Sequence, residues 1–168
     1  EYKLHTIFIG VNPTLFTPVT EESRKAKRRE LNIPQDAFVV GSFQKDGVGW
    51  GEGLTPKMIK GPDTFVEAME LVATKVSELH VLLTGPSRGY VKQELTRKKI
   101  RWSHIYVDTY KELGFYYHAV NSYVVSSREE GGPKAILESM ASGVPIISTA
   151  VGQATELIDH NINGMLCQ

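Results

Sequence analysis

The sequence lacks features on which several classes of protein depend. Its single cysteine, Cys167, excludes an internal disulfide framework and a cysteine-cluster zinc site, and favours a reducing compartment. Charge of one sign is not in excess either, because 19 lysines and arginines balance 19 aspartates and glutamates. General affinity for nucleic acid or for an anionic membrane surface is therefore not expected. No apolar run approaches the roughly 20 residues of a membrane span, and no signal peptide is recognised.

The 168 residues predict one domain, at roughly 150 residues per domain. A chain of this length buries about 70% of its unfolded surface, so folding should need neither a metal nor a disulfide. Because the first residue is Glu1 and not methionine, we expect the chain to be a piece of a longer protein.

Common cofactor and metal motifs are also missing. The glycine-rich segment 46–53 follows a predicted strand, but its alternating glycines have no GxGxxG register. We therefore interpret this segment as a long mobile loop and not as a dinucleotide site. The sequence has no Walker A motif and no HExxH pair, so catalytic zinc is not expected.

One catalytic motif is matched. Gly85–Gly89 fits the GxSxG elbow of α/β-hydrolases, with Ser87 as the nucleophile. The other triad residues would be Asp108 and either His118 or His160, which follow in the required order. Glycine, proline and serine are also the residues of an ordinary turn, and the chain of a hydrolase of this fold is normally longer. The turn is the favoured interpretation, and the hydrolase stays as an alternative.

Short apolar runs alternate with amphipathic stretches along most of the chain. Strands are predicted over residues 6–11, 37–43, 80–84, 105–107, 123–126, 145–148 and 165–167. Helices are predicted from a cap at Thr20 to about Asn32, and over residues 65–79, 90–99, 110–119, 137–144 and 155–158. Apolar strands separated by helices indicate an α/β fold with a doubly wound, Rossmann-like parallel sheet. In such a sheet, ligands bind beyond the carboxyl ends of the strands.

The first predicted helix is rich in basic residues but is interpreted as a solvated helix face. Its acidic residues balance the positive charge, which makes a nucleic-acid site the weaker interpretation. The basic residues are Arg24, Lys25, Lys27, Arg28 and Arg29, and the acidic ones are Glu21, Glu22 and Glu30.

The segment 128–138 follows a predicted strand and opens a predicted helix. Its glycines would let a ligand approach the backbone, and free N–H groups at a helix start favour a phosphate. Pro133 is expected at the first helical position, where its missing N–H costs nothing. A continuous helix would separate Glu130 from Glu138 by roughly 12 Å, which suits carboxylates that bind the sugar and the ribose of one nucleotide sugar. The structural alternative is that Glu129 and Glu130 complement the helix dipole and Glu138 pairs with Lys134.

This segment, continued by residues 139–147, closely resembles the donor-binding motif of the group-one family of retaining GT-B glycosyltransferases. Other pieces of the chain are similar to further elements of that family, in the same order. They are residues 7–12 with Phe16 and Pro18, residues 40–43, Lys60-Gly61, residues 82–86, residues 152–157 and Asn163-Gly164. The resemblance covers nearly the whole chain and implies that residues 1–168 are the nucleotide-sugar donor-binding domain, one half of a GT-B fold. Residues 1–19 resemble the interdomain crossing, and the N-terminal acceptor domain would be absent.

The resemblance also implies roles for individual residues. Lys60 would bind the diphosphate and Glu130 the donor sugar, and these two would be the catalytic residues. Glu138 would bind the ribose hydroxyls, the backbone at Gly131-Gly132 the sugar or phosphate, and the backbone at Val107 the nucleobase.

Two positions depart from the family pattern. The predicted donor site includes Gly41 and Ser42, but Ser42 stands where the family usually has an arginine that helps Lys60 neutralise the diphosphate. Pro133 stands where a glycine is common, which removes one N–H contact. Three nearby residues could substitute for the arginine: Gln44, Lys45 and Lys57.

The reaction that the resemblance implies is transfer of a sugar from a nucleotide diphosphate sugar to a glycan, lipid or small-molecule acceptor. Configuration would be retained, without a cofactor or an obligatory metal. The implied partners are the donor and the N-terminal acceptor domain, so the isolated chain is expected to bind the donor but to transfer negligible sugar. A non-catalytic nucleotide-sugar binding module and a related GT-B epimerase are the alternatives. The implied location is cytoplasmic, and a parent protein at the cytoplasmic membrane face is compatible with it.

Overall fold

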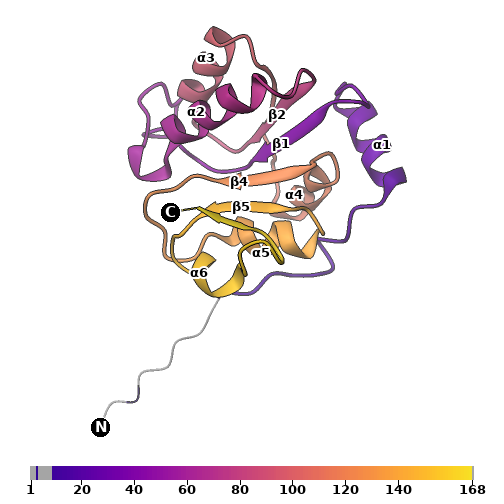
Figure 1. The fold of residues 1–168 in the computed structure, drawn as a ribbon, viewed down its shortest axis with the longest axis vertical. Helices are drawn as coiled ribbons and strands as arrows, with labels where there is room; N and C mark the ends of the chain where they lie inside the picture. The colour runs from indigo at the N-terminus through magenta and orange to yellow at the C-terminus, as the bar shows by residue number, and fades with distance from the viewer. Residues whose placement is uncertain (1–2, 4–8, 168) are drawn as a thin grey trace.

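The computed structural model describes residue 3 and residues 9–167 of the chain (Figure 1). The strand predicted over residues 6–11 begins outside the described residues, and its described part, residues 9–11, is irregular.

Six parallel strands form a single sheet in the order β3-β2-β1-β4-β5-β6, within the part of the chain that the structure describes. The strands are β1 (Phe38–Ser42), β2 (Leu79–Thr84), β3 (Arg101–Ile105), β4 (Ser122–Val125), β5 (Ile146–Thr149) and β6 (Met165–Cys167). The chain starts the sheet at β1, winds outward to β3, and then returns to β4 on the other side of β1. This arrangement confirms the predicted doubly wound α/β fold.

Helices cover both faces of the sheet. They are α1 (Glu21–Glu30), α2 (Pro62–Ala73), α3 (Gly89–Arg97), α4 (Tyr110–Tyr117), α5 (Lys134–Ala141) and α6 (Ala154–Leu157), with a short 3-10 helix, η1 (Met58–Lys60). Figure 1 shows α2 and α3 beside β1 and β2, and α5 and α6 beside β4 and β5. Successive strand residues face opposite sides: Val39 packs in the core under α4 and α5, whereas Val40 packs in the core under α2 and α3.

Several predicted boundaries were wrong: the helix predicted over residues 137–144 is α5, at Lys134–Ala141, and two other elements differ more. The third strand covers residues 101–105 instead of 105–107, in register with β2 from His80–Arg101 to Thr84–Ile105. This edge strand is only partly buried, so its polar residues hide it from a search for apolar runs. Helix α2 ends at Ala73 because the backbone N–H and the hydroxyl of Thr74 both donate to the Leu71 carbonyl. The apolar periodicity beyond that point belongs to a turn and to β2.

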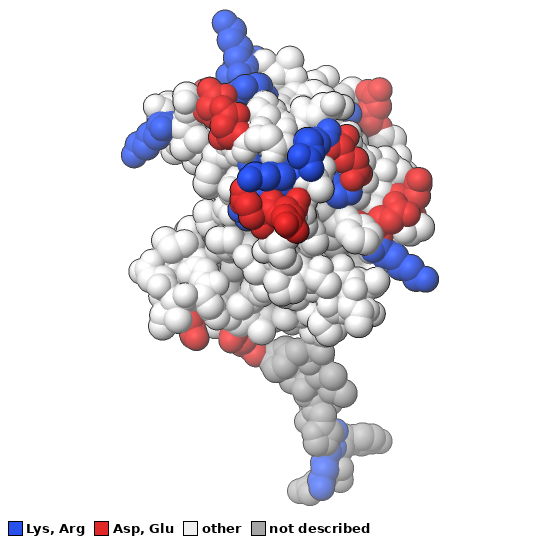
Figure 2. Space-filling view, turned by 90° about the vertical axis from the view of Figure 1, so that its right-hand side faces the viewer, with Lys and Arg blue, Asp and Glu red and all other residues white. Residues whose placement is uncertain are grey.

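The basic helix α1 is capped at Thr20 as predicted, by reciprocal hydrogen bonds with Ser23. Lys25 and Lys27 pair with glutamates of the same helix, which agrees with a solvated, charge-balanced face. In the view of Figure 2, side chains of both signs lie next to each other. Arg28 differs from the prediction, because it is buried and donates to Ala119, Gln35 and Asn121. It ties α1 to the core.

Candidate functional site

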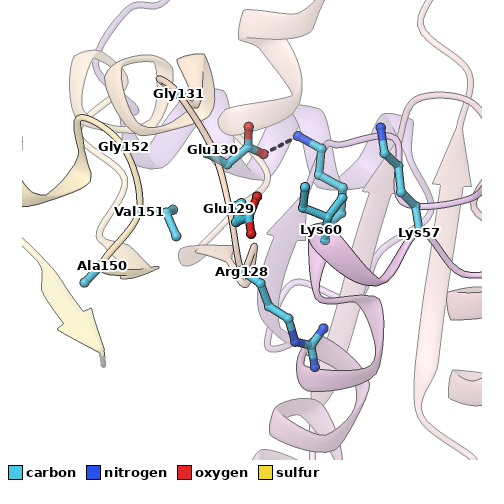
Figure 3. Close-up of a pocket in the computed structure, with 10 residues that line it drawn as sticks. Lys57, Lys60, Arg128, Glu129, Glu130, Gly131, Ala150, Val151 and Gly152 are labelled. Atoms are coloured by element: carbon cyan, nitrogen blue, oxygen red, sulfur yellow. Dashed lines mark hydrogen bonds and ion pairs between the residues drawn. The ribbon is translucent and has the colours of Figure 1, made fainter.

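A cleft of about 640 Å³ lies beyond the carboxyl ends of the central strands (Figure 3). Three segments line it: the residues of η1 and Lys57 before it, the loop after β4, and the loop after β5. The lining residues are Lys57, Ile59, Lys60, residues 128–131 and residues 150–152. A ligand here would therefore meet loops from both halves of the sheet, as the fold predicts.

Lys60 and Glu130 form an ion pair at the edge of this cleft (Figure 3). Their side chains are 24% and 16% exposed, and the Ser127 hydroxyl donates to the same Glu130 oxygen at 3.0 Å. Gly61 makes this approach possible: its φ is +59°, and a Cβ there would lie 1.9 Å from the Ser126 carbonyl oxygen. Because the Ser126 hydroxyl also donates to the Gly61 carbonyl at 2.9 Å, η1 is fixed against the end of β4 with Lys60 facing Glu130.

Lys57 is the second lysine of the cleft, and Figure 3 draws its side chain alongside that of Lys60. Its backbone N–H donates to the Asp46 carbonyl at 2.7 Å. The other two residues suggested as substitutes for an arginine have different partners. Gln44 donates to the Lys60 carbonyl, and the Lys45 ammonium lies 3.6 Å from the ring centroid of Trp50.

Glu138 lies on α5 and is almost completely buried, with both carboxylate oxygens hydrogen-bonded to tyrosines. Oε1 accepts from the Tyr110 hydroxyl at 2.8 Å, and Oε2 accepts from the Tyr117 hydroxyl at 3.0 Å. Burial raises the pKa of Glu138 above its ordinary value, although the two tyrosine hydroxyls act in the opposite direction. Lys134 forms no ion pair with Glu138 among the described residues; its ammonium lies 5.2 Å from the ring centroid of Tyr110. The Lys134–Glu138 alternative was therefore wrong.

The backbone between the two glutamates is not a continuous helix. Helix α5 begins at Lys134, and Pro133 occupies the cap position before it, so the expected position of Pro133 and the continuous helix assumed between the glutamates were both wrong. Gly131 lines the cleft, and apart from its two chain neighbours no residue has a heavy atom within 4 Å of where its Cβ would be. Gly152 follows β5 with φ +48°, and a Cβ there would come within 2.3 Å of the Gly131 carbonyl. The backbones of the loops after β4 and β5 thus approach each other closely at Gly131 and Gly152.

The remaining predicted site residues lie away from the cleft lining. Gly132 packs against Ile9 and Gln153, and Gly41 lies in β1 where a Cβ would come within 3.1 Å of side chains on β4 and the turn before it. Ser42 is wholly buried. Val107 is half-buried, two residues beyond the end of β3.

A buried ion pair that the sequence did not indicate lies below the predicted site. Arg88 donates through Nε to Asp46 Oδ1 at 3.0 Å, and its Nη2 lies 2.9 Å from Oδ2. Its other donors reach the Ser42 carbonyl, the Ser42 hydroxyl and the Thr84 carbonyl at 2.5, 3.0 and 2.8 Å. One guanidinium therefore joins the ends of β1 and β2 to Asp46, whose carbonyl holds Lys57. The guanidinium is 0% exposed, so it cannot itself contact a ligand.

The GxSxG motif forms a turn and not a hydrolase site. The Ser87 hydroxyl lies 3.0 Å from the carbonyl oxygens of both Gly49 and Gly51 and shares its one proton between them. The histidines proposed for a triad have other partners: His118 contacts Thr17, and His160 accepts from the Leu166 N–H. The Ser87 hydroxyl holds the glycine-rich loop against the start of α3, and the mobility of this loop stays a prediction.

Neither a membrane span nor a metal cluster is found in residue 3 and residues 9–167. No helix there has the length and apolarity to cross a membrane, and no three His, Cys, Asp or Glu side chains are grouped as metal ligands would be.

A parallel α/β sheet with a lysine–carboxylate cleft at its carboxyl edge defines a domain suited to phosphate-bearing ligands. The family model "Glycosyl transferases group 1" matches residues 48–168, more than half of the chain. The chain belongs to this family, which confirms the resemblance seen in the sequence.

Related proteins extend the match. D-inositol 3-phosphate glycosyltransferase 1 of Catenulispora acidiphila is 25% identical over 182 residues, 99% of this chain and 40% of that protein. An uncharacterized glycosyltransferase of Haemophilus influenzae is 27% identical over 112 residues, 65% of this chain and 32% of that protein. The chain thus spans about a third to two fifths of the length of these relatives.

Solved structures agree on the fold. Sucrose-phosphate synthase of Thermosynechococcus elongatus is 27% identical with a TM-score of 0.71, covering 94% of this chain and 37% of that one. The C-terminal domain of LpcC, a group 1 glycosyl transferase of Francisella tularensis, is 22% identical with a TM-score of 0.73. The match covers 95% of this chain and 80% of that one. Anabaena HepE, solved with UDP-glucose, is 22% identical with a TM-score of 0.75, and the match covers 95% of this chain and 42% of that one. The domain is a GT-B glycosyltransferase domain of Rossmann-like fold.

Proposed function

We propose that this chain binds a nucleotide diphosphate sugar as the donor half of a retaining, metal-independent glycosyltransferase. The observation that carries the proposal is the Lys60–Glu130 pair with Lys57 beside it, at the carboxyl edge of the sheet. Two ammonium groups suit the charge of a diphosphate, and a carboxylate next to them suits sugar hydroxyls, because an ionised carboxylate only accepts hydrogen bonds. The family membership and the UDP-glucose bound to HepE, a protein of the same fold, support this assignment.

The diphosphate is assigned to Lys60 and Lys57. Of the three residues considered as substitutes for the arginine, Lys57 is the one that lines the cleft. The Gln44 side chain donates to the Lys60 carbonyl, and the Lys45 ammonium lies over the Trp50 ring. The exposed backbone at Gly131 lets a ligand approach the loop after β4.

The nucleoside is assigned to the opposite end of the site. Glu138 would accept the ribose hydroxyls, and the backbone at Val107, just beyond β3, would contact the base. Glu130 would hold the donor sugar on the side of the cleft where transfer takes place.

The proposed reaction breaks the bond between the anomeric carbon and the diphosphate oxygen and forms a bond to the acceptor oxygen on the same face. The two lysines would stabilise the charge that develops on the leaving diphosphate, a role that a bound metal has in other enzymes. The acceptor proton would pass to the departing phosphate oxygen. The acceptor site would belong to a further domain, which positions the acceptor and keeps water away.

A non-catalytic binding module is the second candidate, and one observation favours it. Ser42, at the position of the family arginine, is buried under Arg88 and offers the cleft no charge. Sugar transfer by a protein that joins this chain to an acceptor domain, measured with a radiolabelled donor, would separate the two candidates.

A thermal-shift panel with UDP, GDP and ADP, with and without EDTA, tests the binding proposal. A nucleotide at 100 times its Kd should stabilise the fold by about 2.7 kcal/mol, or roughly 5 to 10 °C for a domain of this size. EDTA should change nothing. Lys60→Ala should remove most of the shift, whereas Lys75→Ala, an exposed lysine just beyond the end of α2, should preserve it. An unchanged melting temperature with all three nucleotides would show that the proposed site is wrong.

A further inference from the structure

Glu138 is closed off from solvent in the structure. The residue is 4% exposed, and each of its carboxylate oxygens has a tyrosine hydroxyl as its partner. A ribose cannot hydrogen-bond to a carboxylate that it cannot reach. Ribose binding therefore requires one of the two tyrosines to move.

The two tyrosines differ in their surroundings. Tyr117 is completely buried and packs edge-on against Phe43 at a centroid distance of 4.9 Å. Tyr110 is 44% exposed and is the first residue of α4. Tyr117 thus approaches Glu138 from inside the core, and Tyr110 approaches it from the solvent side.

Little holds Tyr110 in place apart from this hydrogen bond. Its ring contacts Phe16 at a centroid distance of 5.5 Å, and the Lys134 ammonium lies 5.2 Å from its centroid. Thr109 before it makes no side-chain cap bond, and residues 108–110 are exposed. Rotation of one side chain about its Cα–Cβ bond would therefore uncover the carboxylate without a change in the sheet.

We propose that Tyr110 is a removable cover over the ribose-binding carboxylate. In the empty site the Tyr110 hydroxyl donates a hydrogen bond to Oε1 of Glu138. When a nucleotide binds, a ribose hydroxyl donates to this oxygen instead. The inference rests on the proposed function, because it assigns the ribose to Glu138. It makes Tyr110 a positioning residue that sets the affinity for ribonucleotides through Glu138.

The cover is tested by the substitution Tyr110→Phe, which keeps the ring and removes the competing hydroxyl. Isothermal titration calorimetry would measure the Kd of UDP, GDP and ADP, and of the 2′,3′-dideoxy form of whichever binds best. The variant should bind the ribonucleotide about tenfold more tightly, because the ribose no longer displaces a hydrogen bond to a charged group. Its affinity for the dideoxy form should be unchanged, because that ligand has no hydroxyl to offer Glu138.

The control is Tyr117→Phe, which removes the other hydroxyl on the same carboxylate from the buried side. This variant should not tighten ribonucleotide binding, because Tyr110 still covers Glu138. Equal affinities of wild type and Tyr110→Phe for the ribonucleotide would overturn the cover, as would equal gains with the ribo and dideoxy ligands or an equal gain in Tyr117→Phe. Absence of binding by any nucleotide to wild type or variant would overturn the proposed function and the cover with it.

Discussion

Replacing Arg88 with methionine should strongly destabilise the domain. The change leaves the Asp46 carboxylate, which is 1% exposed, without its counter-charge. It also removes the donors to the Ser42 and Thr84 carbonyls at the ends of β1 and β2. Breaking a buried ion pair by removing one partner costs about 3–5 kcal/mol, because the other charge stays buried and uncompensated. For a domain of this size the melting temperature should fall by roughly 10 °C.

The assay is equilibrium urea unfolding of wild type, Arg88→Met, Asp46→Leu and the double variant. Replacing both charges by apolar groups is often nearly neutral, so the double variant should be more stable than Arg88→Met alone. The coupling energy of this cycle should be about 2 kcal/mol or more, within the range for directly contacting groups. A loss below about 1 kcal/mol in Arg88→Met, or strictly additive losses, would refute the reasoning from burial.

The ion pair should also affect ligand binding. The Asp46 carbonyl accepts from the Lys57 N–H, so Asp46 links Arg88 to a lysine of the proposed diphosphate site. At temperatures where the variant is still folded, Arg88→Met should weaken nucleoside diphosphate binding. Unchanged affinity would show that Lys57 is held well enough by its other contacts.

Three further predictions follow from other residues. Glu138→Ala should weaken binding of a bare nucleoside diphosphate by less than the roughly 1.5–3 kcal/mol of a hydrogen bond to a charged group, because the ribose replaces the Tyr110 hydroxyl there. Glu130→Ala should weaken only sugar-bearing donors, and equal effects of both changes on the bare nucleotide in calorimetry would reverse the proposed orientation. Burial, with the nearby arginines, lowers the pKa of His80 to about 4. Because the unfolded histidine binds its proton near pH 6.5, the unfolding free energy should fall by up to about 3 kcal/mol as the pH falls from 6.5 to 4. Urea titrations of His80→Gln should lack that part of the loss. Ser87→Ala removes the hydroxyl that is shared between two carbonyls of the glycine-rich loop. Chymotrypsin should therefore cleave after Trp50 faster than in wild type, and an unchanged rate would mean that other contacts hold the loop.

The sequence was sufficient for the sheet because its inner strands are buried on both faces. Strand β2 is buried along its whole length, and β1 along all but its first residue, so both appear as continuous apolar runs. Strand β3 lies at the edge and carries Arg101, Ser103 and His104, which no search for apolar runs could select. The end of α2 was missed for a related reason: apolar residues continue beyond the helix, and the hydrogen bonds of Thr74 end it.

The site could be predicted only in part. Sequence spacing singled out Glu130 and Glu138, because the motif that contains them is local, and the family resemblance added Lys60. The partners of these residues are not local: Lys60 reaches Glu130 across 70 positions, and Tyr110 reaches Glu138 across 28. Asp46 and Arg88 are 42 positions apart in a pair that no motif describes. Contacts of this kind depend on how the loops fold at the sheet edge, and a single sequence does not contain them as a pattern.

Both glutamates of the proposed donor site already have partners from the chain itself, and this changes how affinity should arise there. Glu130 accepts from Lys60 and Ser127, so a diphosphate that approaches Lys60 competes with a carboxylate. The hydroxyls of a donor sugar can donate to Glu130 in place of the Lys60 ammonium. A bare diphosphate has no such hydroxyls, so it leaves the half-buried Glu130 with one hydrogen-bond donor fewer. The cost of an unsatisfied buried acceptor exceeds the net gain from an added hydrogen bond. In the proposed function, the domain therefore binds a complete donor more tightly than its nucleotide product mainly because the product leaves Glu130 without a hydrogen-bond donor in place of Lys60.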